Sequence, residues 1–325
     1  MDLTGKKVLV TGGTGMVGCK LVDQLLQLNC DVTVVSLDDP SNANPNTRFV
    51  SADIRYLDKC EEICDGQEIV FHVAGIKGSP ELTKTRPASF FVPMMLFNTA
   101  MLEAAQRSPT VKWTMYTSTV GVYGPASVFE ESKLWDQNPS PNDWYAGWAK
   151  RMGEVQLEAY AIENGKRNFS IIRPVNIYGS KGENFNPKTS MVIQSLVRKF
   201  CEDDEVVIWG DGKSVRDFVN ARDVASAMIY AVQHEISLPL NVGSGVGYSI
   251  SELAETIRGL VDRDVRVTYD INKPSGDRYR VADISRIKSF GWTPKVSLRD
   301  GLRETIEWYK THKIGNRYDA FLEKA

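Results

Sequence analysis

The sequence predicts an α/β protein built on a doubly wound parallel sheet, with a smaller α/β lobe toward the C-terminus. Two observations carry this prediction. Short apolar runs typical of buried strands alternate with helical patterns through the first half of the chain. The first run, 8–10, is followed by glycines at 12, 15 and 18 and then by helical spacing over 19–28. Strand, glycine turn and helix in that order predict the start of a nucleotide-binding βαβ unit.

The remaining elements follow in order along the chain. We expect strands at 32–35, 49–52, 69–73, 113–117 and 169–172, and helices at 58–64, 90–106 and 144–164. Beyond residue 176 the alternation changes, with helices expected at 191–201, 250–261 and 298–311 and a strand at 206–209. We therefore expect a dinucleotide-binding domain, 1–178, to which about 216–242 returns. The rest, 179–325, is expected to form mainly a substrate-binding lobe over the carboxyl ends of the strands.

Composition narrows the class of protein. The 325 residues are 42% hydrophobic and 25% charged, with a formal net charge of −2. This balance shows no basic excess of the kind that nucleic-acid-binding proteins carry. No stretch approaches the roughly 20 apolar residues of a membrane span. The first strand begins within a few residues of the start, so we expect no signal peptide. Five scattered cysteines and three histidines show no metal-ligand spacing and predict free thiols in a cytoplasmic protein.

The glycine turn explains how a dinucleotide would be held. Gly12 permits the tight turn, Gly15 lets the backbone approach a pyrophosphate, and Gly18 allows close packing of helix and strand. The helix N-terminus then offers free N–H groups and a positive dipole end to the phosphates. A purely structural glycine turn is the alternative.

The end of the second strand bears on the choice between NAD and NADP. An acidic residue there holds the ribose hydroxyls in NAD-binding units. This strand ends at Ser36, with Asp38 two residues later, and no Lys or Arg stands where a 2′-phosphate needs one. NAD is therefore favoured over NADP. Asp53 and Ile54 lie where the third strand passes the adenine, although a helix cap is the alternative for Asp53.

Seven segments in order resemble the extended short-chain dehydrogenase/reductase family, the NAD-dependent epimerases and dehydratases of sugar nucleotides. They are 11–18, 72–75, 118–124, 173–179, 209–212, 216–218 and 274–277, and 86–91 looks most like the GDP-fucose synthase branch. The resemblance covers nearly the whole chain. It implies a Rossmann fold, a nucleotide-diphosphate sugar as substrate, and a homodimer formed through the helices at 90–106 and 145–164. It also implies cofactor contacts at Thr14, Met16, Val17, Ala74 and Pro174.

The family chemistry moves a hydride between the nicotinamide and a sugar carbinol, usually at C4. The resemblance assigns the sugar-oxygen contact to Thr119 and the nicotinamide-ribose contact to Lys150. A tyrosinate takes the hydroxyl proton, and the lysine lowers the pKa of that tyrosine. The alternative for Thr119 is a strand-end threonine that satisfies a backbone group. For Lys150 it is a solvated helix lysine.

The tyrosine is out of place. The family spaces it four residues before the lysine, on one helix face, but residue 146 is Ala and the tyrosine is Tyr145, rotated by about 100°. Three explanations remain. Tyr145 lies in a non-helical lead-in, another group or water is the base, or the oxidoreductase step is lost and a non-catalytic dinucleotide-binding regulator remains.

Other departures limit the reaction. No acidic pair follows Thr119, which argues against 4,6-dehydration, and Gly121 replaces the fucose synthases' cysteine. No histidine occurs at 180–183, where Lys181 is the one candidate substitute as an acid. What remains is 4-epimerisation or a simple 4-keto reduction or oxidation.

The resemblance also implies substrate contacts. Asn176 and Arg216 match positions that hold the diphosphate, for which a planar guanidinium is suited. Asp277 matches an acid that binds the ribose or orders its loop. A surface ion pair with Asp217 or Asp211 is the alternative for Arg216.

Overall fold

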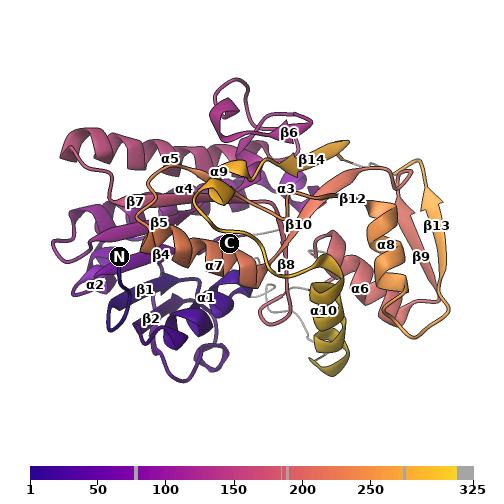
Figure 1. The fold of residues 1–325 in the computed structure, drawn as a ribbon, viewed down its shortest axis with the longest axis horizontal. Helices are drawn as coiled ribbons and strands as arrows, with labels where there is room; N and C mark the ends of the chain where they lie inside the picture. The colour runs from indigo at the N-terminus through magenta and orange to yellow at the C-terminus, as the bar shows by residue number, and fades with distance from the viewer. Residues whose placement is uncertain (77–79, 184, 188–189, 274–275, 313–325) are drawn as a thin grey trace.

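The computed structural model describes residues 1–76, 80–183, 185–187, 190–273 and 276–312. Its larger part is a seven-stranded parallel sheet of order β11-β7-β5-β4-β1-β2-β3, seen on the left in Figure 1. The strands are β1 (Lys7–Thr11), β2 (Asp31–Ser36), β3 (Arg48–Ser51), β4 (Ile69–His72), β5 (Trp113–Thr117), β7 (Phe169–Pro174) and β11 (Leu240–Val242). The predicted fold class, a doubly wound parallel α/β sheet with a smaller second part, is confirmed.

Helices cover both faces of this sheet, which is why its central strands are apolar and buried throughout. On one face α1 (Met16–Gln27) packs against α7 (Ala221–Gln233). On the other face lie α2 (Leu57–Cys64), α4 (Pro87–Arg107) and α5 (Trp144–Asn164). The strand order reverses around β1, so a crevice opens at the carboxyl ends of β1 and β4, where open α/β sheets bind ligands.

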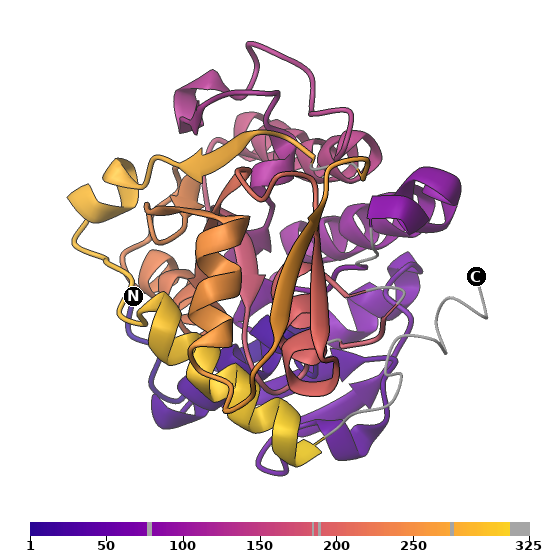
Figure 2. The ribbon, with the colours of Figure 1, turned by 90° about the vertical axis from the view of Figure 1, so that its right-hand side faces the viewer.

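The smaller part carries two short sheets (Figure 2). One has the order β12-β10-β14-β6 with β8 paired to β10, and the other pairs β13 with β9. Its own apolar core lies among these strands and α6, α8 and α10. The elements are β6 (Val128–Phe129), β8 (Asn176–Tyr178), α6 (Val192–Glu202), β9 (Glu205–Trp209), β10 (Val215–Asn220), β12 (Gly247–Ser249), α8 (Ile250–Arg258), β13 (Arg266–Asp270), β14 (Tyr279–Ala282) and α10 (Leu298–His312).

The chain passes between the two parts more than once. After β10 it enters α7, whose N-cap is the side chain of Asn220, and then runs to β11, which pairs with β7 at the edge of the large sheet. Residues 221–242 therefore complete the larger part, although they follow much of the smaller one in sequence.

Most element boundaries differ from the prediction by one to three residues. The first helix begins at Met16 rather than residue 19, directly after the glycine turn, and α8 ends at Arg258 because Gly259 forms its C-cap. The sequence patterns missed the helix α7, the strands β10 and β13, and the short elements, among them α3 (Pro80–Thr85), α9 (Ser285–Ser289), β8 and β12. Strands of three residues give too few alternations to be recognised.

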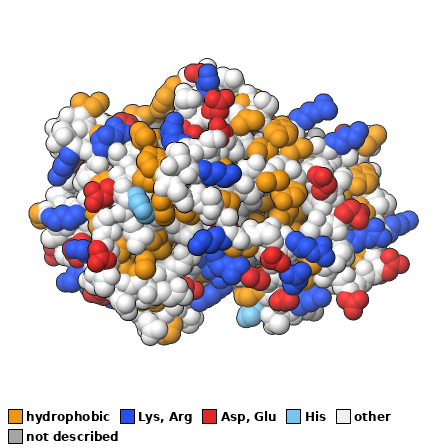
Figure 3. All heavy atoms as spheres, viewed as in Figure 1, with side chains coloured by type: hydrophobic (Ala, Val, Ile, Leu, Met, Phe, Trp, Pro, Cys, Tyr) orange, Lys and Arg blue, Asp and Glu red, His pale blue; other side chains and the backbone are white. Residues whose placement is uncertain are grey.

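One expectation about membranes needs correction. The segment Ala88–Arg107 of α4 is long and apolar enough to span a membrane by length and composition, although 56% of its most apolar window is buried. It packs along α5 and against α2 as a core helix. All five cysteines are free, and all but Cys201 are buried. Charged side chains of both signs are spread over the face in Figure 3.

Candidate active site

The glycine turn after β1 is shaped for a close backbone approach. Gly12 has φ +68°, and a Cβ there would lie 2.9 Å from the Cα of Ala74. A Cβ on Gly18 would overlap the carbonyl oxygen of Gly12. The first intrahelical bond of α1 is donated by Cys19 to Gly15, so the N–H groups of Met16, Val17 and Gly18 precede it. These three N–H groups have no acceptor within the helix, which is the feature that anion-binding helix termini use.

This turn gives a matched pair of variants. Gly18→Ala is expected to destabilise the protein by about 1–3 kcal/mol or more, because the methyl group has no space. Gly15 has an ordinary φ of −74°. The methyl group of Gly15→Ala would lie 3.3 Å from the Gly12 oxygen, so this variant should still fold. Its NADH affinity should fall at least about tenfold, because the second glycine allows the backbone to approach the pyrophosphate. Urea denaturation and NADH fluorescence titration measure both, and equal stability of the two variants would contradict the account.

Three predicted cofactor residues meet beside the turn. The Thr14 hydroxyl lies 2.9 Å from the Ser36 Oγ and 2.5 Å from the Asp38 Oδ2, and the Asp38 N–H donates to the Ser36 Oγ at 3.2 Å. The carboxylate of Asp38 is therefore held at the end of β2, although it stands two residues beyond the strand.

The other predicted cofactor residues lie around the same crevice. Asp53 does not cap α2, whose N-cap is Tyr56. Its carboxylate instead accepts from the Arg55 guanidinium at 2.6–3.0 Å, and this bonding lowers the pKa of Asp53 against the opposing effect of burial. Ile54 packs against the core beneath α2, and Pro174 ends β7.

Lys150 is buried, not solvated. Its side chain is 8% exposed and its Nζ lies 5.1 Å from the centre of the Tyr116 ring. Burial lowers the pKa of Lys150 to about 7, although the Glu154 carboxylate one turn later raises it. On β4, His72 bonds Thr11 and Asn98, and burial together with Lys150 lowers the His72 pKa to about 3. A neutral imidazole therefore lies under the crevice.

Thr119 and Tyr145 differ in what they offer. The Thr119 Oγ1 accepts from the Gly121 N–H at 3.1 Å, as the structural alternative expects. That bond uses only an oxygen lone pair and leaves the hydroxyl hydrogen to donate. Tyr145 is the second residue of α5, so it does not lie in a non-helical lead-in. It is 45% exposed, and its ring meets Phe91 edge-on at 6.0 Å.

The predicted substrate residues come from the opposite side of the crevice. Arg216, in β10, donates to the Val215 carbonyl at 2.8 Å, and a Cβ on Gly276 would lie 3.2 Å from its Nη2. Burial, with a contribution from Arg280, lowers the pKa of Arg216 to about 10, against the raising effect of Asp277 and Asp143. The Asp217 carboxylate binds Ser244 and Gly245 instead of forming the suggested pair with Arg216.

The remaining predicted contacts are more structural. Asp277 accepts from Asn142 at 2.8 Å and Ser140 at 3.1 Å, which fits the loop-ordering alternative. Asn176 donates to the Asp217 carbonyl of β10 at 2.9 Å. The carbonyl of Lys181 accepts from the Cys19 thiol at 3.4 Å. The backbone of Lys181 therefore lies at the start of α1, near the glycine turn. Pro274 and Ser275, of the 274–277 motif, fall outside the described residues.

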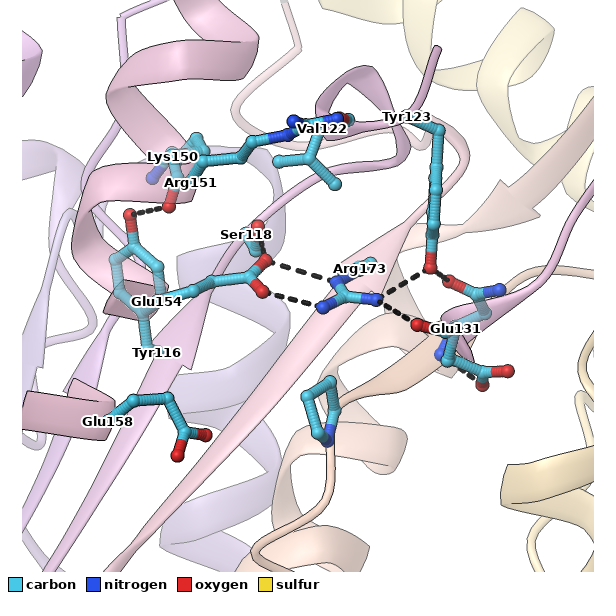
Figure 4. Close-up of polar contacts among 12 residues, drawn as sticks. Tyr116, Ser118, Val122, Tyr123, Glu131, Lys150, Arg151, Glu154, Glu158 and Arg173 are labelled. Atoms are coloured by element: carbon cyan, nitrogen blue, oxygen red, sulfur yellow. Dashed lines mark hydrogen bonds and ion pairs between the residues drawn. The ribbon is translucent and has the colours of Figure 1, made fainter. Parts of the chain in front are cut away.

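A buried ion pair fixes the elements that carry Lys150 and Thr119, which we call the platform. Figure 4 shows this pair with Lys150 and Ser118. Arg173 of β7 and Glu154 of α5 are 3% and 4% exposed and meet at 2.6 Å. Ser118, next to Thr119, donates to the same carboxylate, and Arg173 also donates to the Tyr123 hydroxyl at 2.7 Å. Burial alone lowers the pKa of Arg173, but the Glu154 carboxylate outweighs it and raises the pKa. The pair ties α5, β5 and β7 together.

Known proteins match this chain over nearly its whole length. Residues 8–243 match the family described as "NAD dependent epimerase/dehydratase family". The chain belongs to the NAD-dependent epimerase/dehydratase family. It is 32% identical over 323 residues to a probable GDP-L-fucose synthase 1 of Oryza sativa subsp. japonica, covering 95% of this chain and 94% of that protein. It is 31% identical over 316 residues to a putative UDP-glucose 4-epimerase of Methanocaldococcus jannaschii. That alignment covers 94% of this chain and 99% of that protein.

Solved structures of epimerases share the fold. The UDP-glucose 4-epimerase of Thermotoga maritima, determined with UDP-glucose, superimposes with a TM-score of 0.82 at 28% identity, covering 94% of this chain and 99% of that one. A UDP-N-acetylglucosamine 4-epimerase of Methanobrevibacter ruminantium, in complex with UDP-N-acetylmuramic acid, gives 0.84 at 25% identity, covering 95% and 99%.

In this family member, sequence reasoning missed the charged groups that join the two sides of the crevice. Arg280 of β14 lies 2.6 Å from Asp143, at the start of α5, and 3.7 Å from Asp277. No sequence pattern indicated a role for Glu154. The one local signal was an Asp directly before the predicted helix 144–164. Within the described ranges, no group of three His, Cys, Asp or Glu side chains is arranged to hold a metal ion.

Proposed function

We propose that the protein is an NAD(P)-dependent sugar-nucleotide epimerase or reductase that works by hydride transfer at the sugar C4 through a keto intermediate. One observation carries the proposal. Thr119 and Lys150 lie on the platform fixed by the buried Glu154–Arg173 pair. Arg216 and Asp277 lie near the residues that directly precede α5. The family membership and the named activities of the relatives support the same class.

The residues fit a dinucleotide. The turn at Gly12 and Gly18 leaves no space for side chains, and the N–H groups that precede the first intrahelical bond of α1 would hold the pyrophosphate. Thr14, Ser36 and Asp38 would hold the adenosine ribose, and Met16, Val17, Ala74 and Pro174 would contact the cofactor. When bound, the nicotinamide supplies a reversible hydride acceptor. The Lys150 Nζ would bind the nicotinamide ribose, and the Thr119 hydroxyl would donate to the sugar oxygen.

Asp38 supports NAD rather than NADP. A carboxylate held at the end of β2 accepts from ribose hydroxyls, and it repels a 2′-phosphate. We expect the protein to bind NADH more tightly than NADPH. Asp38→Asn should reduce the ratio of the two affinities about tenfold or more. Fluorescence titration of both cofactors measures it, with the exposed Asp39→Asn as a matched control. Tighter binding of NADPH by the unaltered protein would reverse the assignment.

The substrate end of the site is suited to a nucleotide diphosphate. A hollow of about 770 Å³, open to solvent, lies beside Asp277 and Arg280 and is bordered by Lys213 and Phe129, but not by Thr119, Lys150 or Arg216. The buried Arg216 offers a fixed guanidinium to a diphosphate. Asn176 and Lys181 stay as weaker candidates, because their described contacts are to the protein itself.

The second candidate function, a non-catalytic dinucleotide-binding regulator, is favoured by the position of Tyr145. A panel assay separates the two. The protein is incubated with UDP-, GDP-, CDP- and dTDP-sugars and either cofactor, and products are followed by NMR. We expect turnover of at least one sugar. NAD(P)H binding without affinity for any nucleotide sugar would support the regulator and overturn the enzyme.

We also propose the assembly and location that the resemblance implies. A cytoplasmic homodimer would form through α4 and α5, whose outward side chains include the 46%-exposed Leu96 and the 84%-exposed Ile162. Residues 1–178 with about 216–242 would act as the dinucleotide-binding domain, and 179–325 mainly as the substrate lobe.

A further inference from the structure

Asp143 stands at the N-terminus of α5 but does not act as a cap. Aspartate is a favoured N-cap residue, because its carboxylate can accept from the exposed N–H groups at about 1 kcal/mol of stabilisation. Asp143 occupies the N-cap position with no side-chain bond to them. Its carboxylate is turned instead toward Arg280, 2.6 Å away. Because the Asp143 carboxylate does not accept from the N–H groups of α5, its role depends on the side chains around it.

That role lies beside Thr119. A Cβ built on Gly121 would lie 3.3 Å from both the Cβ and Cγ of Asp143 and 3.4 Å from the Cγ2 of Thr119. Asp143 and the methyl group of Thr119 therefore both lie close to Gly121, where a side chain would be crowded. No other side chain within the described ranges pairs with the Asp143 carboxylate beyond Arg280.

Asp143 stands at the N-terminus of the helix that carries Lys150. Within that helix Ala146 and Lys150 are four residues apart and share one face. Ala146 packs against the apolar cluster that contains Phe90. Tyr145 is turned away to Phe91.

We propose that the Asp143 carboxylate is the proton acceptor for the sugar hydroxyl that is oxidised, and the proton donor when the keto group is reduced. This inference rests on the proposed function. On oxidation the carbinol C–H bond breaks and its hydrogen leaves with the electron pair to the nicotinamide ring of NAD(P). The O–H bond breaks, its proton passes to Asp143, and the remaining electron pair forms the C=O bond. Arg280, with Arg216 and Asp277 behind it, holds the carboxylate toward the substrate side.

The test uses the full chain with UDP-glucose and GDP-L-fucose as probes, beside the wider sugar panel. Asp143→Asn should slow turnover at least about 100-fold, in the range of general acid–base catalysis. NADH binding by fluorescence, UDP binding by calorimetry and the melting temperature should change little. Asp136→Asn, an exposed carboxylate of the preceding loop, is the matched control and should keep the parental rate.

A structural role is separated by chemical rescue. Sodium formate should restore turnover to Asp143→Ala, where it can replace the missing carboxylate, but not to Lys150→Met. Parental turnover by Asp143→Asn, absence of formate rescue, or an equal loss in Tyr145→Phe would each overturn the inference while leaving the proposed function intact. If the unaltered protein binds NAD(P)H but no nucleotide sugar in the panel, the proposed function fails and this assignment fails with it.

Discussion

Glu154→Gln is expected to lower the free energy of unfolding by about 3–5 kcal/mol, because it leaves the buried Arg173 guanidinium without its counter-charge. Urea denaturation followed by circular dichroism measures the loss. Turnover should fall as well, since Ser118 beside Thr119 and the helix that carries Lys150 are fixed by the same carboxylate.

The next turn of the same helix provides the control for this prediction. Glu158 pairs with Arg167 at 2.5 Å, but both side chains are about 40% exposed, so Glu158→Gln should change stability by no more than about 1 kcal/mol. The double variant Glu154→Leu with Arg173→Met should recover much of the loss, because it buries no unpaired charge. Similar effects of Glu154→Gln and Glu158→Gln would show that the buried pair does not anchor the platform.

Lys150→Met is expected to stabilise the cofactor-free protein at pH 6 by about 2–4 kcal/mol, since one pKa unit corresponds to about 1.4 kcal/mol. Burial lowers the pKa of Lys150 to about 7 in the fold, whereas the unfolded chain keeps the ordinary value near 10.5. Below pH 7 both states hold the proton, so the folded protein bears the full penalty of a buried ammonium. From pH 7 to 10.5 the folded lysine is neutral while the unfolded one is charged, and the penalty shrinks.

Melting temperatures at pH 6 and pH 9 check the sign. The difference in melting temperature between Lys150→Met and the unaltered protein should be large at pH 6 and smaller at pH 9. The exposed Lys59→Met should show no such gap at either pH. Saturating NADH should stabilise the unaltered protein and not the variant, because ligand binding stabilises only the state that binds it. A Lys150→Met protein that melts below the parent at pH 6 would contradict the burial account.

The sequence predicted what local patterns determine. The apolar runs of β5 and β7, the glycine turn and the length of α5 all follow from spacing along the chain, and they were confirmed within a few residues. The contacts of Thr14 with Ser36 and Asp38 were not predicted, although the first turn and the end of the second strand are neighbours in any such unit.

The rest depended on contacts across long separations. The pairing of Glu154 with Arg173 spans two elements, and that of Asp143 with Arg280 joins α5 to β14. A single sequence carries no signal for such partners, and motif matching directed attention to Tyr145. The burial of Lys150, which contradicts the solvated alternative, likewise depends on tertiary packing over its helix.

The return of the chain from β10 through α7 to β11 determines how far the molecule can be dissected. A fragment ending at residue 178 would lack α7, the helix that packs along α1, and would leave β7 as an open edge without β11. It would expose the apolar face of α1 to water and favour edge-to-edge association through β7. The two parts of the molecule therefore cannot be exchanged as single continuous segments. A chimera that swaps sugar specificity between relatives has to graft at least two separate segments, on either side of 221–242.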